Sequence, residues 1–179
     1  WAVEVHATIL EKVKGHGAAI EALERLFETD QEADRIAPLL TPYYEQTGEW
    51  EKLIPVCEVQ KGNAGSLDEQ VHWDFKIANL YEEKGGDTEL AFMYYGLAYQ
   101  AAPDNEKTLV ELLRLTELLE NQADLIALLE TSVEDVSSIE HQCFLRETMA
   151  ELALNSLNDR ETAKKHQRAI LELDGSRMS

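Results

Sequence analysis

The sequence predicts an all-α protein built from about five antiparallel helical hairpins. Apolar residues recur with helical spacing along nearly the whole chain, and no strand-like alternation lasts more than a few residues. Leu, Glu and Ala dominate, which favours helices, and 9 Gly and 4 Pro among 179 residues are too few for a loop-rich or all-β chain. With 44% apolar residues the chain can bury a core, which excludes intrinsic disorder.

Ten helices follow one another in order, with short connections that contain Gly, Pro, Asn, Asp or Ser. We expect them over residues 2–14, 17–29, 32–47, 49–61, 67–84, 87–101, 104–120, 122–135, 138–156 and 159–173. Because connections of this length make neighbouring helices antiparallel, the helices form hairpins. The predicted hairpins cover about 1–30, 31–65, 66–103, 104–137 and 138–174 of a single repeat domain, residues 1–174, and residues 175–179 form a polar tail.

Three of the four prolines fall inside the expected helices of the second hairpin. Pro38 fits the first turn of a helix, where its missing N–H is harmless. Pro42 and Pro55 lie too deep for that position. Either their helices kink, or the expected boundaries are displaced by several residues.

A repeat underlies the hairpins. Taking Ala91 as an anchor, corresponding apolar residues occur at Ala19, Leu53, Leu125 and Ala163, at spacings of 34, 38, 34 and 38 residues. Residues four and seven positions after each anchor share its helical face. Anchors that are 72 residues apart resemble each other best, which suggests growth by duplication of blocks of two hairpins.

The chain resembles the tetratricopeptide repeat (TPR) family, whose unit is a helix-turn-helix of about 34 residues. The best match to the family pattern lies in residues 71–103. The first and second hairpins of the chain match the pattern less well, and the fourth and fifth match it poorly. The step from Tyr81 to Ala91 is one residue longer than the family's, which the extra glycine of the pair at 85 and 86 explains. The resemblance implies an α-α superhelix, a right-handed TPR-like solenoid, and a generic helical solenoid is the alternative. The matching residues of the third hairpin are Ala78, Tyr81, Ala91, Tyr95, Ala98 and Pro103.

The resemblance also implies a concave groove, lined by the first helix of each hairpin, that binds a partner. From it we take Phe75, Asn79, Val110 and Arg114 as the candidate partner-binding residues. The alternative is that these positions pack between repeats. Trp50, which begins a second helix, is expected to pack. The full set of groove positions is Arg35, Pro38, Pro42, His72, Phe75, Asn79, Lys107, Val110, Arg114 and Leu118.

The function that this pattern favours is a protein–protein interaction scaffold that binds a peptide or helix in the groove. The alternative is a purely structural spacer or self-assembly segment of a larger repeat protein, which associates with itself through open solenoid ends. With 16 basic and 35 acidic residues, the net charge of −19 repels nucleic acid and favours a neutral or basic protein or peptide partner. No apolar run is long enough to span a bilayer, so no membrane association is expected.

No catalytic, metal or cofactor site is expected, so the sequence does not indicate an enzyme. The five histidines are scattered without metal-ligand spacing, and the chain has no phosphate-binding glycine motif. Cys57 occupies a repeat core position, where a small apolar residue fits. The two cysteines cannot form a disulfide framework, which favours a reducing, cytoplasmic location.

Overall fold

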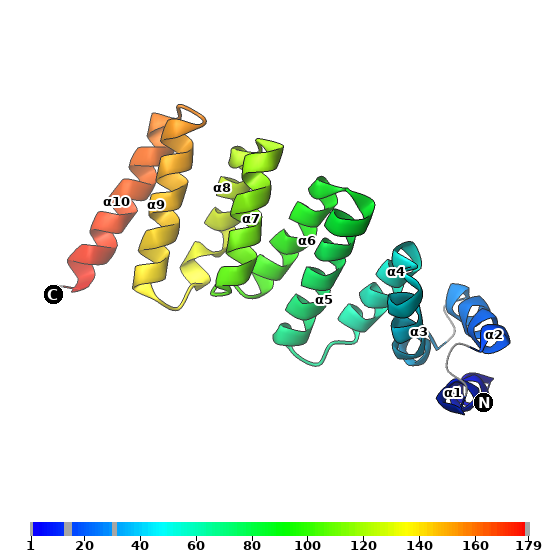
Figure 1. Ribbon diagram of the computed structural model, residues 1–179. Helices are drawn as coiled ribbons and strands as arrows, with labels where there is room; N and C mark the ends of the chain where they lie inside the picture. Colours follow the sequence, from blue (N-terminus) through cyan, green and yellow to red (C-terminus); the bar gives the residue numbers. More distant parts are fainter. Residues whose placement is uncertain (1, 13–15, 30–31, 178–179) are drawn as a thin grey trace. The chain divides into compact units, whose positions relative to one another are not determined.

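A computed structural model describes residues 2–12, 16–29 and 32–177 (Figure 1). These residues form ten α-helices, a π-helical turn and a 3-10 turn, and they contain no strand. The all-α class is therefore confirmed, and every expected helix is present. The chain divides into two compact units, unit 1 (Trp1–Gly86) and unit 2 (Asp87–Ser179), whose boundary falls inside the third expected hairpin, 66–103.

The described residues of unit 1 form five α-helices and the π-helical turn. Each helix packs against the next one along the chain. The helix α3 (Ala33–Thr47) shows why these residues pack as helices. Its buried side chains, which include Ile36, Leu40 and Tyr44, recur every four residues and therefore share one face. The elements are α1 (Ala2–Lys12), α2 (Gly17–Glu28), α3 (Ala33–Thr47), α4 (Trp50–Gly62), α5 (Leu67–Leu80) and η1 (Tyr81–Gly85).

The prolines lie inside intact helices. Pro38 and Pro42 belong to α3 and Pro55 to α4, so the expected boundaries hold. The first-turn position expected for Pro38 is wrong, because Pro38 is the sixth residue of α3. All three prolines are exposed. The carbonyl that each one leaves without a helical donor, four residues earlier, lies on the same face and can accept from water instead.

The extra residue of the third repeat is absorbed in a π-helical turn, η1, which follows α5 directly. The turn brings Gly85 against the indole of Trp50, where a Cβ atom at position 85 would lie 3.1 Å from the ring. The expected packing role of Trp50 is thus confirmed. The turn ends at Gly86, whose φ of 65° lies in the left-handed region.

Gly86→Ala is expected to lower the free energy of unfolding by about 1 kcal/mol, because an L side chain at positive φ is strained. Gly62→Ala is the matched control, since Gly62 lies in a helical turn and a Cβ atom there meets nothing within 4 Å. Urea unfolding followed by Trp fluorescence measures both. If Gly86→Ala is no more destabilising than Gly62→Ala, the left-handed conformation at position 86 is wrong.

In unit 2, residues 87–177 form five further α-helices and a 3-10 turn. Neighbours along the chain pack together, and α6 also contacts α8, where a Cβ atom at Gly96 would lie 3.4 Å from Leu128. The last helix extends to Arg177, so residues 175–177 of the expected tail are helical, and residues 178 and 179 lie outside the described part. The elements are α6 (Thr88–Ala101), α7 (Glu106–Leu119), α8 (Gln122–Ser132), η2 (Val133–Asp135), α9 (Ile139–Asn155) and α10 (Arg160–Arg177).

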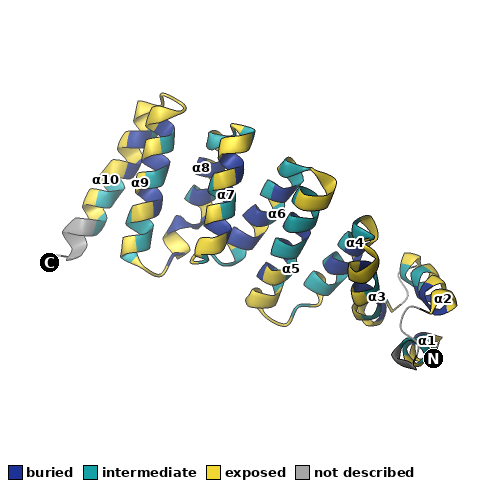
Figure 2. Cartoon of the chain, in the orientation of Figure 1, coloured by how far each residue is buried: buried dark blue, intermediate teal, exposed yellow. Residues whose placement is uncertain are grey.

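The repeat register agrees with the burial pattern (Figure 2). The five anchors Ala19, Leu53, Ala91, Leu125 and Ala163 are all buried. They therefore occupy the core positions that the repeat spacing predicts on α2, α4, α6, α8 and α10.

Candidate interaction surface

The four predicted partner-binding residues fall on two helices. Phe75 and Asn79 lie one turn apart on α5 of unit 1, and Val110 and Arg114 lie one turn apart on α7 of unit 2. The structure brings the members of each pair together on one helix face, and each pair is a feature of its own unit. None of the ten positions assigned to the groove is buried.

The solvent-exposed face of α7 carries two large apolar side chains. The Asn105 side chain caps the helix by accepting from the backbone N–H of Lys107 at 3.1 Å. Val110, Arg114 and Leu118 follow one another at four-residue intervals, and we call them the α7 stripe. Val110 is 59% exposed and Leu118 is 64% exposed.

Arg114 contributes little net charge to the α7 stripe. Its Nε and Nη2 atoms lie 2.8 and 2.7 Å from Oε2 of Glu111, one turn earlier on the same helix. The carboxylate holds the guanidinium along the helix surface and balances its charge. The α7 stripe is therefore mainly an apolar surface in an acidic protein.

Phe144 on α9 is an exposed aromatic residue that the candidate set omits. It lies 34 residues after Val110 and is 50% exposed. Its ring centroid is 6.3 Å from that of His141. The repeat register does not identify it, because the 38-residue step from Leu125 to Ala163 carries Val110 to Thr148 rather than to Phe144.

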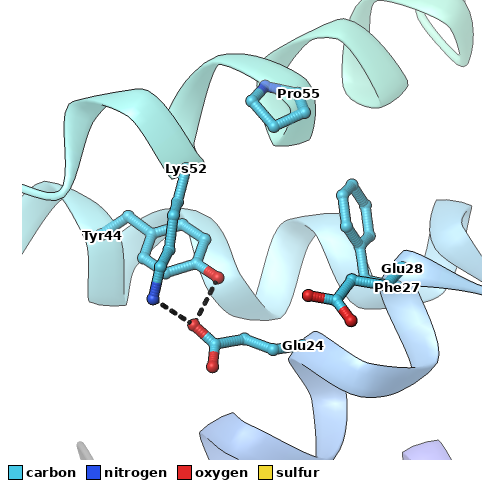
Figure 3. A pocket seen from close by; sticks show the side chains of 6 residues that line it. All are labelled: Glu24, Phe27, Glu28, Tyr44, Lys52 and Pro55. Atoms are coloured by element: carbon cyan, nitrogen blue, oxygen red, sulfur yellow. Dashed lines mark hydrogen bonds and ion pairs between the residues drawn. The ribbon is translucent and has the colours of Figure 1, made fainter.

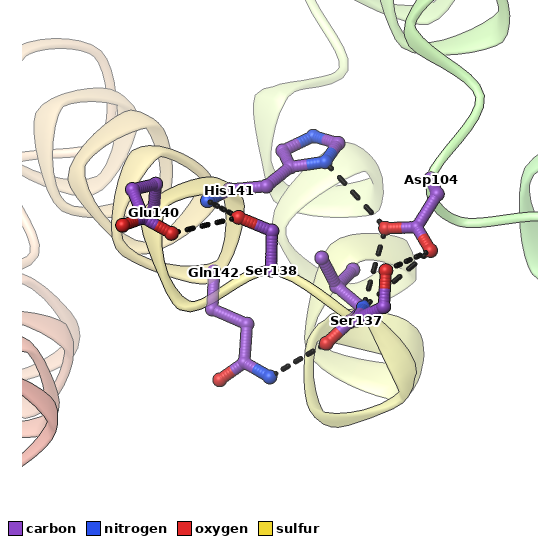
Figure 4. Close-up of polar contacts among 7 residues, drawn as sticks. Asp104, Ser137, Ser138, Glu140, His141 and Gln142 are labelled. Carbon is purple, nitrogen blue, oxygen red and sulfur yellow. Dashed lines mark hydrogen bonds and ion pairs between the residues drawn. The ribbon is translucent and has the colours of Figure 1, made fainter.

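A polar network ties the beginning of α7 to the beginning of α9 (Figure 4). Asp104, just before α7, accepts from the Ser137 hydroxyl at 2.8 Å and from the Ser137 N–H at 3.3 and 3.4 Å. His141 Nδ1 lies 3.7 Å from the same carboxylate. In turn, the Ser138 side chain caps α9. The α7 stripe and Phe144 therefore lie on two helices whose N-terminal ends are held together.

Cys57 and His166 are two buried titratable residues. Burial raises the pKa of Cys57 to about 11, so the thiol stays protonated and unreactive at neutral pH. His166 on α10 is buried, with its Nε2 3.0 Å from Oε1 of Glu130 on α8, and burial lowers its pKa. Across residues 2–12, 16–29 and 32–177, no three His, Cys, Asp or Glu side chains are arranged to hold a metal ion.

Cavities occur in both units among the described residues. One of about 350 Å³ lies in unit 1 between α2, α3 and α4. One of about 360 Å³ in unit 2 is lined by Glu89, Phe92, Leu119, Asn121 and Asp124. A smaller one, of about 160 Å³, lies between α9 and α10.

No protein-family model matches the chain, and no curated protein matches it in sequence. Of the helices that the structure describes, none combines the length and the apolar character needed to cross a membrane.

Proposed function

We propose that the protein is a non-enzymatic protein–protein interaction scaffold that binds a peptide or short helix along α7 and α9. The observation that carries the proposal is the exposure of Val110, Leu118 and Phe144 on two helices that Asp104 joins at their ends. Apolar side chains held at the surface on rigid helices gain free energy when a partner covers them, about 25 cal/mol per Å² of apolar surface.

The proposed architecture is a TPR-like solenoid, in which α7 and α9 are the first helices of consecutive repeats. Supporting this are the buried anchors at repeat spacing and the packing of helices in neighbouring pairs. First helices line the partner-binding face of such solenoids. Phe75 and Asn79 of α5 are proposed to serve the same function in unit 1.

The partner is proposed to be neutral or basic. A net charge of −19 gives the protein a negative field that attracts cationic partners and repels anionic ones. The α7 stripe does not reverse this field, because Glu111 balances its one cation. Recognition then depends on apolar contact, while the field accelerates encounter.

Panning a phage-displayed random peptide library against the protein tests the proposal. A selected peptide is expected to lose about tenfold or more in affinity to each of Val110→Ser, Leu118→Ser and Phe144→Ser, because apolar anchors dominate such interfaces. Isothermal titration calorimetry measures the dissociation constants. Thermal unfolding checks that these surface changes leave the fold intact.

Leu157→Ser is the matched control, because Leu157 is an exposed leucine between α9 and α10, far along the chain from both helix starts. It should leave the affinity unchanged. Failure of several independent libraries to yield any peptide, or equal effects of all four substitutions, favours the alternative, a structural spacer or self-assembly segment.

A further inference from the structure

The cavity in unit 1 has the chemistry of a side-chain binding site (Figure 3). Its volume of about 350 Å³ lies near the lower end of the range of ligand pockets, so it suits one or two side chains rather than a large cofactor. Three helices build it, which makes its shape independent of any loop. It is lined by Glu24, Phe27 and Glu28 of α2, Tyr44 of α3, and Lys52 and Pro55 of α4.

One side of the cavity is apolar. Figure 3 shows the Phe27 ring pointing from α2 towards α4, on which Pro55 lies. The buried ring of Tyr44 adds a second aromatic surface. These groups can enclose the aliphatic part and the flat face of a long side chain.

The other side is polar, and Lys52, the one cation among the lining residues that the structure describes, is already neutralised. Glu24 Oε1 accepts from the Tyr44 hydroxyl and from Lys52 Nζ, both at 2.9 Å. Lys52 Nζ also lies 2.8 Å from Glu49 Oε2. Burial and the neighbouring carboxylate raise the pKa of Tyr44, so its hydroxyl stays a donor to Glu24. Lys52 is thus held between two carboxylates.

One lining carboxylate, that of Glu28, takes no part in this network. Glu28 is exposed and forms no ion pair within the described ranges. The lining is therefore rich in acceptors and aromatic surface and poor in free donors.

We propose that this cavity binds the side chain of an arginine on a partner protein. A guanidinium carries five N–H donors and a planar face, so it can donate hydrogen bonds to the carboxylates of Glu24 and Glu28 while its face stacks on the Phe27 ring. The carboxylates of Glu24, Glu28 and Glu49 outnumber the Lys52 ammonium, and the net charge of −19 adds long-range attraction. The proposal does not depend on α7 or α9, so it can stand if the proposed function fails.

Titration of the protein with N-acetyl-arginine-methylamide, followed by ¹H–¹⁵N NMR, tests the proposal. Saturable shifts are expected around residues 24–28, 44 and 52–55, with a millimolar dissociation constant for so small a probe. The citrulline analogue has the same shape without the charge and is expected not to saturate. The lysine analogue is expected to bind several-fold more weakly, because an ammonium lacks the planar face.

Two variants with the same net charge separate the cavity from the general acidity of the surface. Glu28→Gln should weaken arginine binding about threefold, the scale of an exposed charge pair. Glu117→Gln, at an exposed position on α7, should not change it. The proposal is overturned if citrulline or lysine binds as well as arginine, if the two variants behave alike, or if the shifts centre on Glu89 and Asp124 of the unit 2 cavity.

Discussion

Lys61→Met should lower the free energy of unfolding by about 3 kcal/mol at pH 7, because it leaves a buried negative charge without its ion-pair partner. Asp74 on α5 is only 3% exposed, and its Oδ1 lies 2.7 Å from Nζ of Lys61 on α4. Removing the ammonium leaves the carboxylate buried without its counter-ion. The three tryptophans all belong to unit 1, so Trp fluorescence during urea unfolding reports on the unit that contains the pair.

The loss of unfolding free energy caused by Lys61→Met should become smaller as the pH falls. Burial raises the pKa of Asp74 above its usual value, although Lys61 opposes this shift. A carboxyl whose pKa is raised on folding stabilises the native state below its unfolded pKa, about 3.9, and this contribution is lost as the pH rises through the folded value. Lys61→Met raises the folded pKa further, so its cost is full at pH 7 and smaller near pH 4.5.

A double variant distinguishes charge burial from lost side-chain packing. Lys61→Met with Asp74→Leu should recover most of the stability, since replacing both partners of a buried pair by apolar groups is often neutral. Lys84→Met, at an exposed position, should change little. If the double variant is as unstable as Lys61→Met alone, then the loss of stability comes from the aliphatic contacts of Lys61 and not from the buried charge of Asp74.

Much of the fold is predictable from the sequence because the local signals agree with one another. Apolar spacing places the helices, and glycine, proline and short polar residues place their ends. The repeat adds a second, independent register, and it correctly assigns Ala91 and its equivalents to the core. The ten-residue step from Tyr81 to Ala91 marks an inserted residue, but only the structure shows that a π-helical turn absorbs it.

The boundary between the two units has no distinct sequence signal. It falls after Gly86, in a connection that looks like any other turn between helices. A left-handed glycine can end a helix inside a hairpin or at a unit boundary, and the local residues are the same in both cases. Which one occurs depends on contacts between residues distant in sequence.

The candidate surface is predictable only in part, for a similar reason. Helical spacing correctly predicts that Val110 and Arg114 share one face of α7. The contact of Asp104 with Ser137 spans 33 residues and joins two loops, and no local pattern specifies it. The cavity beside Glu24 requires three helices to meet, so its lining emerges only from the packed structure.

Ala91→Leu is expected to lower the free energy of unfolding by about 1–3 kcal/mol through overpacking. Ala91 lies in the first turn of α6, is completely buried, and precedes the buried Tyr95 by one turn. Protein interiors are close-packed, so three additional carbon atoms must displace neighbouring side chains. Far-UV circular dichroism during urea unfolding measures the effect, because unit 2 contains no tryptophan.

Ala127→Leu provides the matched control. Ala127 is also on a helix of unit 2, α8, but it is exposed, so the same substitution should change stability by less than about 0.5 kcal/mol. Ala163, the anchor 72 residues after Ala91, is buried and should respond as Ala91 does. Equal stability of Ala91→Leu and Ala127→Leu would place Ala91 on a solvent-facing side of α6. The repeat register that makes Ala91 equivalent to Leu125 and Ala163 would then be wrong as well.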